Sequence, residues 1–358
     1  MKELYALRDA LLEWYRRNRR PLPWRRDREP YHVWLSEIMC QQTRVEAVKG
    51  YYARFLDALP DIPALAACEE NRPLKLWEGL GYYSRARNLQ RAAKQVMSEY
   101  DGVFPQSYAS VLSLPGIGDY TAAAICSICF RLPTPAVDGN VLRVRARFLA
   151  DRTDIRLPET KKLAREQLLP FFDGVDSGEL NQALMELGAL VCRPNGEPDC
   201  NACPLRSACR SRETQLWREL PYKSPAKPRR IEDKTVFLLR CEGKYAIRKR
   251  PKSGLLAGLW EFPALPGTLD AQEALNAAAA WGVQPVSMGR MTEKQHIFTH
   301  ITWEMRGYEI ECAAAVPEFI WAAVSELRDT YSLPTAFRQF LEAELSDSHT
   351  ESGKGEQK

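Results

Sequence analysis

Hydrophobic residues recur every three to four positions through the first 213 residues, which is the spacing of amphipathic helices. Near the amino terminus, Leu4, Leu7 and Leu11 follow this spacing, with charged residues between them. Gly, Pro and Asp separate further stretches of the same kind, and no convincing strand pair interrupts them. The pattern predicts helices at about residues 31–58, 63–68, 73–79, 84–99, 107–113, 119–131, 139–150, 159–169 and 178–191.

The pattern changes after a segment rich in proline and basic residues. The stretch Leu220–Arg230, LPYKSPAKPRR, is typical of an extended linker. Beyond it the residues alternate with the period of strands, and polar turns separate them. This second part predicts a hairpin formed by residues 235–240 and 245–250, another strand pair at 296–303 and 308–313, and helices at about 270–280 and 335–345.

These changes divide the 358 residues into successive parts, as expected for a chain of two-domain length. We expect a mostly α domain over residues 1–213, a linker over 214–230 and a smaller α+β domain over 231–345. Residues 346–358 are polar and predict a disordered tail, because they offer too little apolar surface for a core.

Charge is distributed unevenly between the two parts. Residues 1–230 contain 36 Lys and Arg against 28 Asp and Glu, whereas residues 231–358 contain 14 against 18. A basic first part favours a polyanionic partner. The longest apolar stretch, Thr121–Phe130, is too short to cross a bilayer, and charges at Lys2 and Glu3 do not fit a signal peptide. We therefore expect a cytoplasmic protein that has no membrane partner.

Four of the ten cysteines are clustered with the spacing C-x7-C-x2-C-x5-C. They are Cys192, Cys200, Cys203 and Cys209. Without an export signal, such a cluster favours a metal site over a disulfide framework, and either zinc or an iron–sulfur cluster would satisfy four thiolates. Cys126 and Cys129 also form a C-x-x-C pair, but they lie in an apolar helical stretch, so we interpret them as core residues.

A glycine turn precedes the helical stretch that starts near Tyr120. Leu114-Pro-Gly-Ile-Gly118 places Gly116 and Gly118 between two predicted helices. Such a turn lets backbone N–H groups approach an anion, and the following helix contributes its positive end. The pattern is that of a helix–hairpin–helix and indicates binding of a DNA phosphate.

Two acidic residues have contrasting surroundings. Glu37 lies in mid-helix on the face of Trp34 and Ile38, where burial would raise its pKa and keep it protonated as an acid. Asp138, in Val-Asp-Gly-Asn-Val, comes just before a helix whose amino terminus favours the anion. On spacing alone, an N-cap role is the simpler interpretation of Asp138.

Several longer stretches resemble the MutY family of adenine DNA glycosylases, in the helix–hairpin–helix–Gly/Pro–Asp superfamily. The resemblance covers nearly the whole chain except the tail. The matching stretches are LPWR (22–25), SEIMCQQTRVEAV (36–48), WEGLGYYSRARNL (77–89), LPGIGDYTAAAI (114–125), VDGNVLRV (137–144), NQALMELGALVC (181–192), the cysteine cluster, LLAGLWEFP (255–263) and HIFTH (296–300).

The resemblance implies a monofunctional enzyme of base excision repair that removes adenine mispaired with 8-oxoguanine, or with guanine, in double-stranded DNA, as a monomer in the bacterial nucleoid. It implies that Glu37 protonates adenine, that Asp138 stabilises the sugar cation, and that Tyr120 and Asn140 support this pair. The residues implied to bind the base are Arg20, Trp24, Arg25 and Gln182. Those implied to contact DNA are Gln42, Thr43, Leu80, Tyr82, Gly116, Gly118, Phe298, Thr299 and His300.

The resemblance also implies a 4Fe–4S cluster held by the four clustered cysteines and a Nudix-like second domain that recognises 8-oxoguanine. A Nudix hydrolase needs carboxylates on its helix for Mg²⁺. Here Ala279 and Ala280 stand in their place, so we expect binding without hydrolysis. The chain departs from the family pattern at Thr299, where Ser is usual, at Cys40, where Leu is usual, and in a first cysteine gap one residue longer.

Two other functions fit parts of the sequence. A bifunctional lyase resembling endonuclease III would need an amine nucleophile two residues after Gly118, where this chain has Tyr120. A non-catalytic DNA-binding module would use the metal site only for architecture. The presence of both Glu37 and Asp138 argues against that second alternative.

Overall fold

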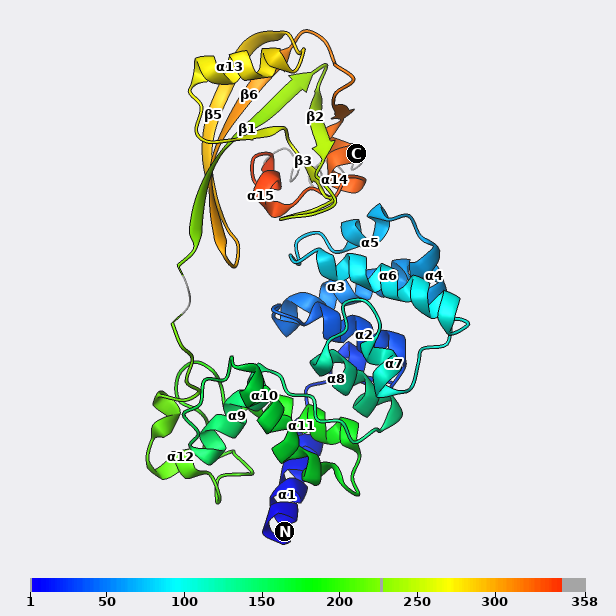
Figure 1. The fold of residues 1–358 in the computed structure, drawn as a ribbon, viewed down its shortest axis with the longest axis vertical. Coiled ribbons are helices and arrows are strands. Elements are labelled where there is room, and N and C mark those ends of the chain that lie inside the picture. Colours follow the sequence, from blue (N-terminus) through cyan, green and yellow to red (C-terminus); the bar gives the residue numbers. More distant parts are fainter. Residues whose placement is uncertain (1, 226–227, 343–358) are drawn as a thin grey trace, which may run out of the picture. The chain divides into compact units, whose positions relative to one another are not determined.

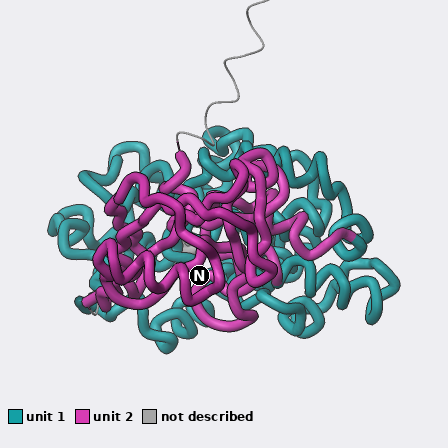
Figure 2. The backbone as a smooth tube through the Cα atoms, turned by 90° about the horizontal axis from the view of Figure 1, so that it is seen from above, with its two compact units in different colours: residues 1–67, 88–225 teal, residues 68–87, 226–358 magenta. Residues whose placement is uncertain are grey.

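The chain folds into two compact units in a computed structural model that describes residues 2–225 and 228–342. Unit 1 comprises residues 1–67 and 88–225, and unit 2 comprises residues 68–87 and 226–358 (Figures 1 and 2). Residues 68–87, which the sequence predicts in the first domain, thus group with the second unit. The predicted tail over 346–358 lies outside the described residues. Within the described ranges, no helix is long and apolar enough to span a membrane.

Unit 1 is built from helices joined by short turns (Figure 1). One further helix, α5 (Asn71–Leu76), belongs to unit 2, and α6 (Ser84–Glu99) begins in unit 2 and continues into unit 1. The other helices of unit 1 are α1 (Lys2–Asn18), η1 (Pro23–Arg25), α2 (Pro30–Met39), α3 (Val45–Ala58), α4 (Ile62–Ala67), α7 (Tyr108–Leu112), α8 (Asp119–Phe130), α9 (Gly139–Leu149), α10 (Pro158–Leu168), η2 (Leu169–Phe172), α11 (Ser177–Leu190), α12 (Arg210–Glu213) and η3 (Leu216–Arg218).

The single helix predicted over residues 31–58 is wrong. The structure has α2 and α3 in its place, separated by a turn at residues 40–44. Gln42 in this turn has a φ of 57°, which no right-handed helix accommodates. The apolar periodicity continues on both sides of the turn, which is why the pattern did not reveal it. The turn brings Gln42 to the surface, with Thr43 beside it.

Helix α11 packs closely against both α8 and α9, because glycines stand at the two contact points. A Cβ atom at Gly178 would lie 2.6 Å from Cα of Ile128 on α8. A Cβ atom at Gly188 would lie 2.6 Å from Cβ of Asn140 on α9. Apolar residues of α1, α9 and α11 form one buried cluster around these contacts. The close approach fixes the start of α9 against α11.

Part of the predicted linker is bound to unit 1. The backbone carbonyl of Leu220 accepts a 2.8 Å hydrogen bond from Arg147 Nε, and Ser224 N donates to Asp154 Oδ2 at 2.9 Å. At its other end, the predicted linker already includes Arg230, the first residue of β1. Proline-rich composition indicated the absence of regular structure, but it could not show these bonds.

Unit 2 is a mixed sheet with helices on both sides (Figure 1). The strand order is β3-β2-β1-β6-β5; in addition, β4 pairs with β1 and β7 with β2. The β1–β6 pair is parallel and the others are antiparallel. The strands and helices are β1 (Arg230–Cys241), β2 (Lys244–Lys249), β3 (Trp260–Glu261), β4 (Ala264–Pro266), α13 (Ala271–Ala280), β5 (Pro285–Ile297), β6 (Ile301–Cys312), β7 (Ile320–Ala322), α14 (Val324–Asp329) and α15 (Thr335–Arg338).

The central strand β1 is buried on both faces, as a covered sheet requires. Val236 and Leu238 face one apolar cluster, which includes Phe337 of α15. Phe237 and Leu239 face another, which α13 covers with small buried alanines. Ala279 and Ala280 are exposed on α13.

The second predicted strand pair is wrong in register. Residues 301–312 form one continuous strand, β6, which pairs with β5, and residues 298–300 form the turn between them. The bond from Phe298 N to Ile301 O, 2.8 Å long, closes this turn. Strand β5 is the last in the strand order, and its register with β6 shifts twice, between Pro285 and Ser287 and between Met288 and Met291. The helix predicted over 335–345 also begins at Thr335 but ends at Arg338.

Candidate active site

Glu37 and Tyr120 meet between α2 and α8. The Tyr120 hydroxyl donates a 2.7 Å hydrogen bond to Glu37 Oε2. The pKa of Glu37 is raised to about 7. Desolvation is the largest cause, the nearby charge of Asp138 adds to it, and the Tyr120 bond opposes it. At neutral pH a substantial fraction of Glu37 therefore carries a proton that it can donate. This is the environment that the sequence predicted for Glu37.

Asp138 is the N-cap of α9 and a neighbour of Glu37. Its Oδ1 accepts a 2.8 Å bond from Val141 N, and its Oδ2 accepts a 2.7 Å bond from Asn140 Nδ2. Burial raises the pKa of Asp138, and these two bonds oppose that shift. The sequence argument considered only the stabilising helix end and did not anticipate the desolvation. Asp138 therefore caps α9 and also lies beside Glu37, so the two interpretations of this residue do not exclude each other.

A hydrogen-bonded chain leads from Asp138 to the start of the cysteine loop. Asn140, which donates to Asp138, accepts a 2.8 Å bond from Arg143 Nη2. The same buried arginine donates from Nη2 to Gly188 O and from Nε to Cys192 O, both at 2.8 Å. Arg143 thereby joins α9, α11 and the first cysteine to the network that holds Asp138.

Of the predicted base-binding residues, Arg25 lies near enough to Glu37 to lower its pKa, and a residue that the sequence did not single out holds Arg25 and Arg20. Glu186 is completely buried, and both of its oxygens accept bonds from Arg20, at 2.8 and 2.9 Å. Its Oε2 also accepts a 2.8 Å bond from Arg25. Gln182, one turn earlier on α11, accepts a 2.7 Å bond from the Tyr15 hydroxyl. Trp24 is buried and packs edge-on against another aromatic ring.

A spacing signal for Glu186 was present in the sequence. Gln182 and Glu186 are four residues apart on one helix, so they share a face. The partners Arg20 and Arg25, however, are more than 160 residues away along the chain. Only the folded structure shows that Arg20 and Arg25 are the partners of the buried carboxylate.

The glycine turn has the geometry that its sequence predicts. Gly116 has a φ of 80°, and a Cβ atom there would lie 2.6 Å from Cβ of Asn88, so only glycine fits. Gly118 is the N-cap of α8, whose first residue is Asp119. The turn thus ends at the amino terminus of a helix, where backbone N–H groups are free of helical partners.

The predicted DNA-contacting residues of unit 2 lie on two segments. Tyr82 has a φ of 48° and is 46% exposed, whereas the adjacent Tyr83 is buried. Core packing therefore accounts for Tyr83 but not for Tyr82. Leu80 is buried as well. The Tyr82 hydroxyl and Thr299 Oγ1 are 2.6 Å apart, which joins the first segment to the β5–β6 turn.

The three residues of the β5–β6 turn differ in exposure. Thr299 and His300 are exposed at its tip, and Phe298 is partly buried against the sheet core. The Phe298 ring packs edge-on against Trp303, with centroids 4.8 Å apart. Trp303 Nε1 in turn donates a 2.9 Å bond to Glu232. A rigid aromatic base thus supports an exposed hydroxyl and imidazole.

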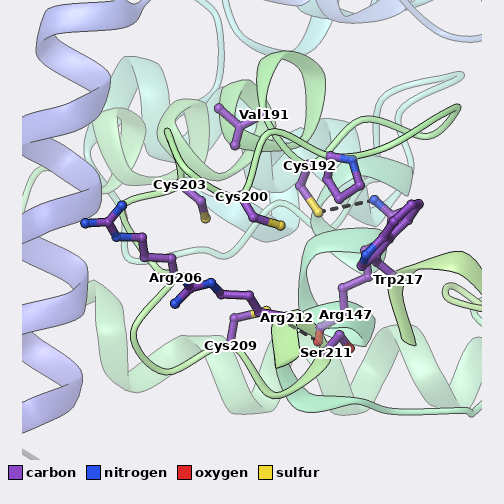
Figure 3. Close-up of a pocket in the computed structure, with 11 residues that line it drawn as sticks. Arg147, Val191, Cys192, Cys200, Cys203, Arg206, Cys209, Ser211, Arg212 and Trp217 are labelled. Carbon is purple, nitrogen blue, oxygen red and sulfur yellow. Dashed lines mark hydrogen bonds between the residues drawn. The ribbon is translucent and has the colours of Figure 1, made fainter. Parts of the chain in front are cut away.

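The four clustered cysteines line one pocket, together with basic residues (Figure 3). Arg147 points into this group and donates a 3.4 Å bond to Cys192 Sγ. Arg206 and Arg212 also line the pocket. Among the residues that the structure describes, no three His, Cys, Asp or Glu side chains form a group that could hold one metal ion.

Comparison with known proteins assigns a family to each part. Residues 35–170 match the HhH-GPD superfamily of base excision DNA repair proteins, and residues 235–343 match the NUDIX domain. The adenine DNA glycosylase of Homo sapiens is 34% identical, over 94% of this chain and 73% of its own length. That of Buchnera aphidicola subsp. Baizongia pistaciae is 38% identical, over 71% of this chain and 72% of its own.

Solved structures resemble the helical part. A thermostable thymine-DNA glycosylase is 27% identical with a TM-score of 0.55, covering 60% of this chain and 98% of that one. Endonuclease III in a non-covalent DNA complex shares the fold, with 21% identity, a TM-score of 0.50, and coverage of 58% of this chain and 96% of that one.

The paired carboxyl groups, the glycine turn and these matches define a DNA glycosylase of base excision repair, an enzyme that hydrolyses N-glycosyl bonds. The full-length similarity is more specific than the fold. The chain belongs to the adenine DNA glycosylase family.

The protonation of Glu37 predicts how the rate depends on pH. Release of the base should slow as pH rises through about 7, because Glu37 then loses the proton that it must donate. Tyr120→Phe removes the bond that lowers this pKa, so the fall should move to higher pH. Single-turnover rates across the neutral range would measure the shift. Tyr108→Phe is the control, because the Tyr108 hydroxyl donates to Asp119 and not to Glu37. It should keep the wild-type pH profile. If the rate of Tyr120→Phe fell at the same pH as the wild-type rate, the pKa argument would be wrong.

Proposed function

We propose that this enzyme hydrolyses the bond between adenine and deoxyribose when the adenine is paired with 8-oxoguanine, or with guanine, in double-stranded DNA. The observation that carries the proposal is the pair of carboxyl groups in one desolvated site, where the pKa of Glu37 is raised to about 7 and Asp138 accepts bonds from Val141 N and Asn140 Nδ2. The names of the relatives, which are adenine DNA glycosylases, support the choice of base.

The reaction begins when adenine leaves the helix and enters the site, at a cost of a few kcal/mol. Arg20, Arg25, Trp24 and Gln182 surround the place that the base would occupy. Glu37 donates its proton to the five-membered ring of adenine, so that the base departs as a neutral molecule with the electron pair of the broken bond. The basic surface and the Gly116–Gly118 turn would hold the DNA backbone meanwhile.

Asp138 acts on the sugar as the base leaves. The broken bond leaves an oxocarbenium-like cation, which the carboxylate stabilises, as paired acids do in glycoside hydrolysis. Asn140 and Val141 N keep Asp138 oriented toward that charge. Glu37, now ionised, can accept the proton of the attacking water, which adds to the sugar carbon and restores the enzyme.

Tyr120 supports a monofunctional reaction. A lyase forms a Schiff base with the sugar and needs an amine nucleophile. The residue at the corresponding position is Tyr120, and its hydroxyl is engaged by Glu37. The strand should therefore stay intact at the abasic site until alkali is added.

The second unit would verify the partner base. Adenine is an ordinary base, so the enzyme must recognise 8-oxoguanine or it would attack correct A·T pairs. Thr299 offers a hydroxyl to the lesion as Ser would, with a stiffer side chain. Tyr82, within bonding distance of Thr299, would insert beside the damaged pair.

The cysteine pocket would hold a 4Fe–4S cluster. Four thiolates are the ligand set of such clusters, and all four lie on one pocket beside Arg147. The cluster would supply a structural anchor for the loop of residues 192–209. Arg206 and Arg212 would then meet DNA phosphate, because a fixed loop presents its charges without an ordering cost.

The catalytic proposal predicts that Glu37→Gln and Asp138→Asn each slow adenine release by roughly 100-fold or more, with affinity for the mispair retained. The assay is single-turnover cleavage, after alkali, of a duplex with adenine opposite 8-oxoguanine. Asp176→Asn is a matched control, since Asp176 also caps a helix through Glu179 N. Near wild-type rates in either catalytic variant would overturn the assignment.

The lesion-reading proposal predicts a loss of selectivity when Phe298, Thr299 and His300 are all changed to Ala. The ratio of rates on duplexes with 8-oxoguanine and with guanine opposite adenine should fall by about 1–3 kcal/mol in free-energy terms. Some release should persist, because Glu37 and Asp138 are unchanged. The control is Thr292→Ala, which removes a hydroxyl from β5 itself and should leave the ratio unaltered. An unchanged ratio and affinity in the triple variant would assign lesion reading to unit 1.

The cofactor proposal predicts a yellow-brown protein that contains iron. Metal analysis should find about four irons per chain. Cys200→Ser should lower folded yield or DNA affinity more than the rate of bond cleavage, whereas Cys68→Ser, outside the pocket, should leave both unchanged. One zinc and no iron per chain would rule the cluster out.

A further inference from the structure

Glu186 is a buried acid that the reaction described above does not use. Its side chain is inaccessible to solvent, and desolvation alone would favour its neutral form. Four bonds from Arg20 and Arg25 outweigh that effect and hold the pKa of Glu186 at about 2. The group is therefore an anion throughout the physiological range.

The hydrogen bonds around Glu186 fix the orientation of the two guanidinium groups as well as the charge of the carboxylate. Arg20 donates from its backbone N, Nε and Nη2 to the two carboxylate oxygens. Arg25 donates to Glu186 through Nη2 and to the Arg20 carbonyl through Nη1, at 2.8 and 3.2 Å. Planar guanidinium groups with such paired contacts have one orientation.

Arg25 stands at the catalytic site, and Arg20 is joined to it through Glu186. The charge of Arg25 acts on Glu37 and lowers its pKa. Arg25 also lies over the ring of Tyr15, whose hydroxyl holds Gln182. One buried carboxylate thus sets the position of the groups that would surround the displaced base.

Resting on the proposed function, we propose that Glu186 is a positioning residue: it holds Arg20 and Arg25 where they orient adenine for protonation, without touching the base itself. Its removal leaves two adjacent cations without their shared anion, so that they repel and turn away. The loss appears in the rate of base release and not in DNA affinity, because affinity comes mainly from phosphate contacts.

The test compares Glu186→Gln, Glu186→Asp and the control Glu179→Gln. Glu179 lies on the same helix and makes a paired contact with Arg16 at the surface. Glu186→Gln should slow single-turnover adenine release by roughly 10- to 100-fold, as a small misplacement of a reacting group does. Its affinity for a duplex with an abasic site opposite 8-oxoguanine should stay near the wild-type value. Glu186→Asp, which keeps the charge, should recover most of the rate, and Glu179→Gln should match wild type.

The results separate this inference from the proposed function. Wild-type protein that releases no adenine contradicts the proposed function, whereas a wild-type rate in Glu186→Gln contradicts only the positioning role. Equal losses of rate and affinity, without recovery in Glu186→Asp, would show that Glu186 serves folding alone. If Glu186→Gln does not fold, Arg25→Lys tests the inference in its place. Lysine keeps the charge but cannot donate to Glu186 and to the Arg20 carbonyl at the same time. A wild-type rate in Arg25→Lys would overturn the inference.

Discussion

Two carboxyl groups, Glu37 and Asp138, share a site from which water is largely excluded, and the hydrogen bonds around them respond to this constraint. Desolvation disfavours both anions, and hydrogen bonds oppose it at both, with more donors at Asp138 than at Glu37. Asp138 receives a helix amino terminus and an amide, whereas Glu37 receives a single phenol. The imbalance in donors favours the anion more at Asp138 than at Glu37, although the two side chains are chemically alike.

The need for hydrogen-bond donors at Asp138 also explains why distant parts of unit 1 are bound together. Asp138 keeps its orientation through Asn140 and Arg143, and Arg143 is anchored on backbone carbonyls of Gly188 and Cys192. That network requires α9 and α11 to lie in close contact, which a glycine at position 188 permits. The start of the cysteine loop therefore takes part in the network that orients Asp138.

The sequence predicted those parts of the site that depend on local structure. The N-cap at Asp138, the turn at Gly116 and the buried face of Glu37 follow from neighbours within a few residues, and the structure has all three. It could not predict the anion at Glu186, whose partners come from the other end of the domain. The break at Gln42 was missed because apolar periodicity continues through it, and the β5–β6 turn was missed because strand propensity does not fix register.

The irregular outer strand of unit 2 bears on how the protein behaves in concentrated solution. A long unpaired strand edge can template another chain and begin aggregation. Strand β5 is such an edge, with Val286 and Met291 exposed, but it starts with a proline and its register with β6 shifts twice. Proline removes a donor and the shifts interrupt a regular ladder, so a second copy finds no continuous edge to extend. The strand that leads into the turn of residues 298–300 is thereby kept from pairing with a second copy of itself.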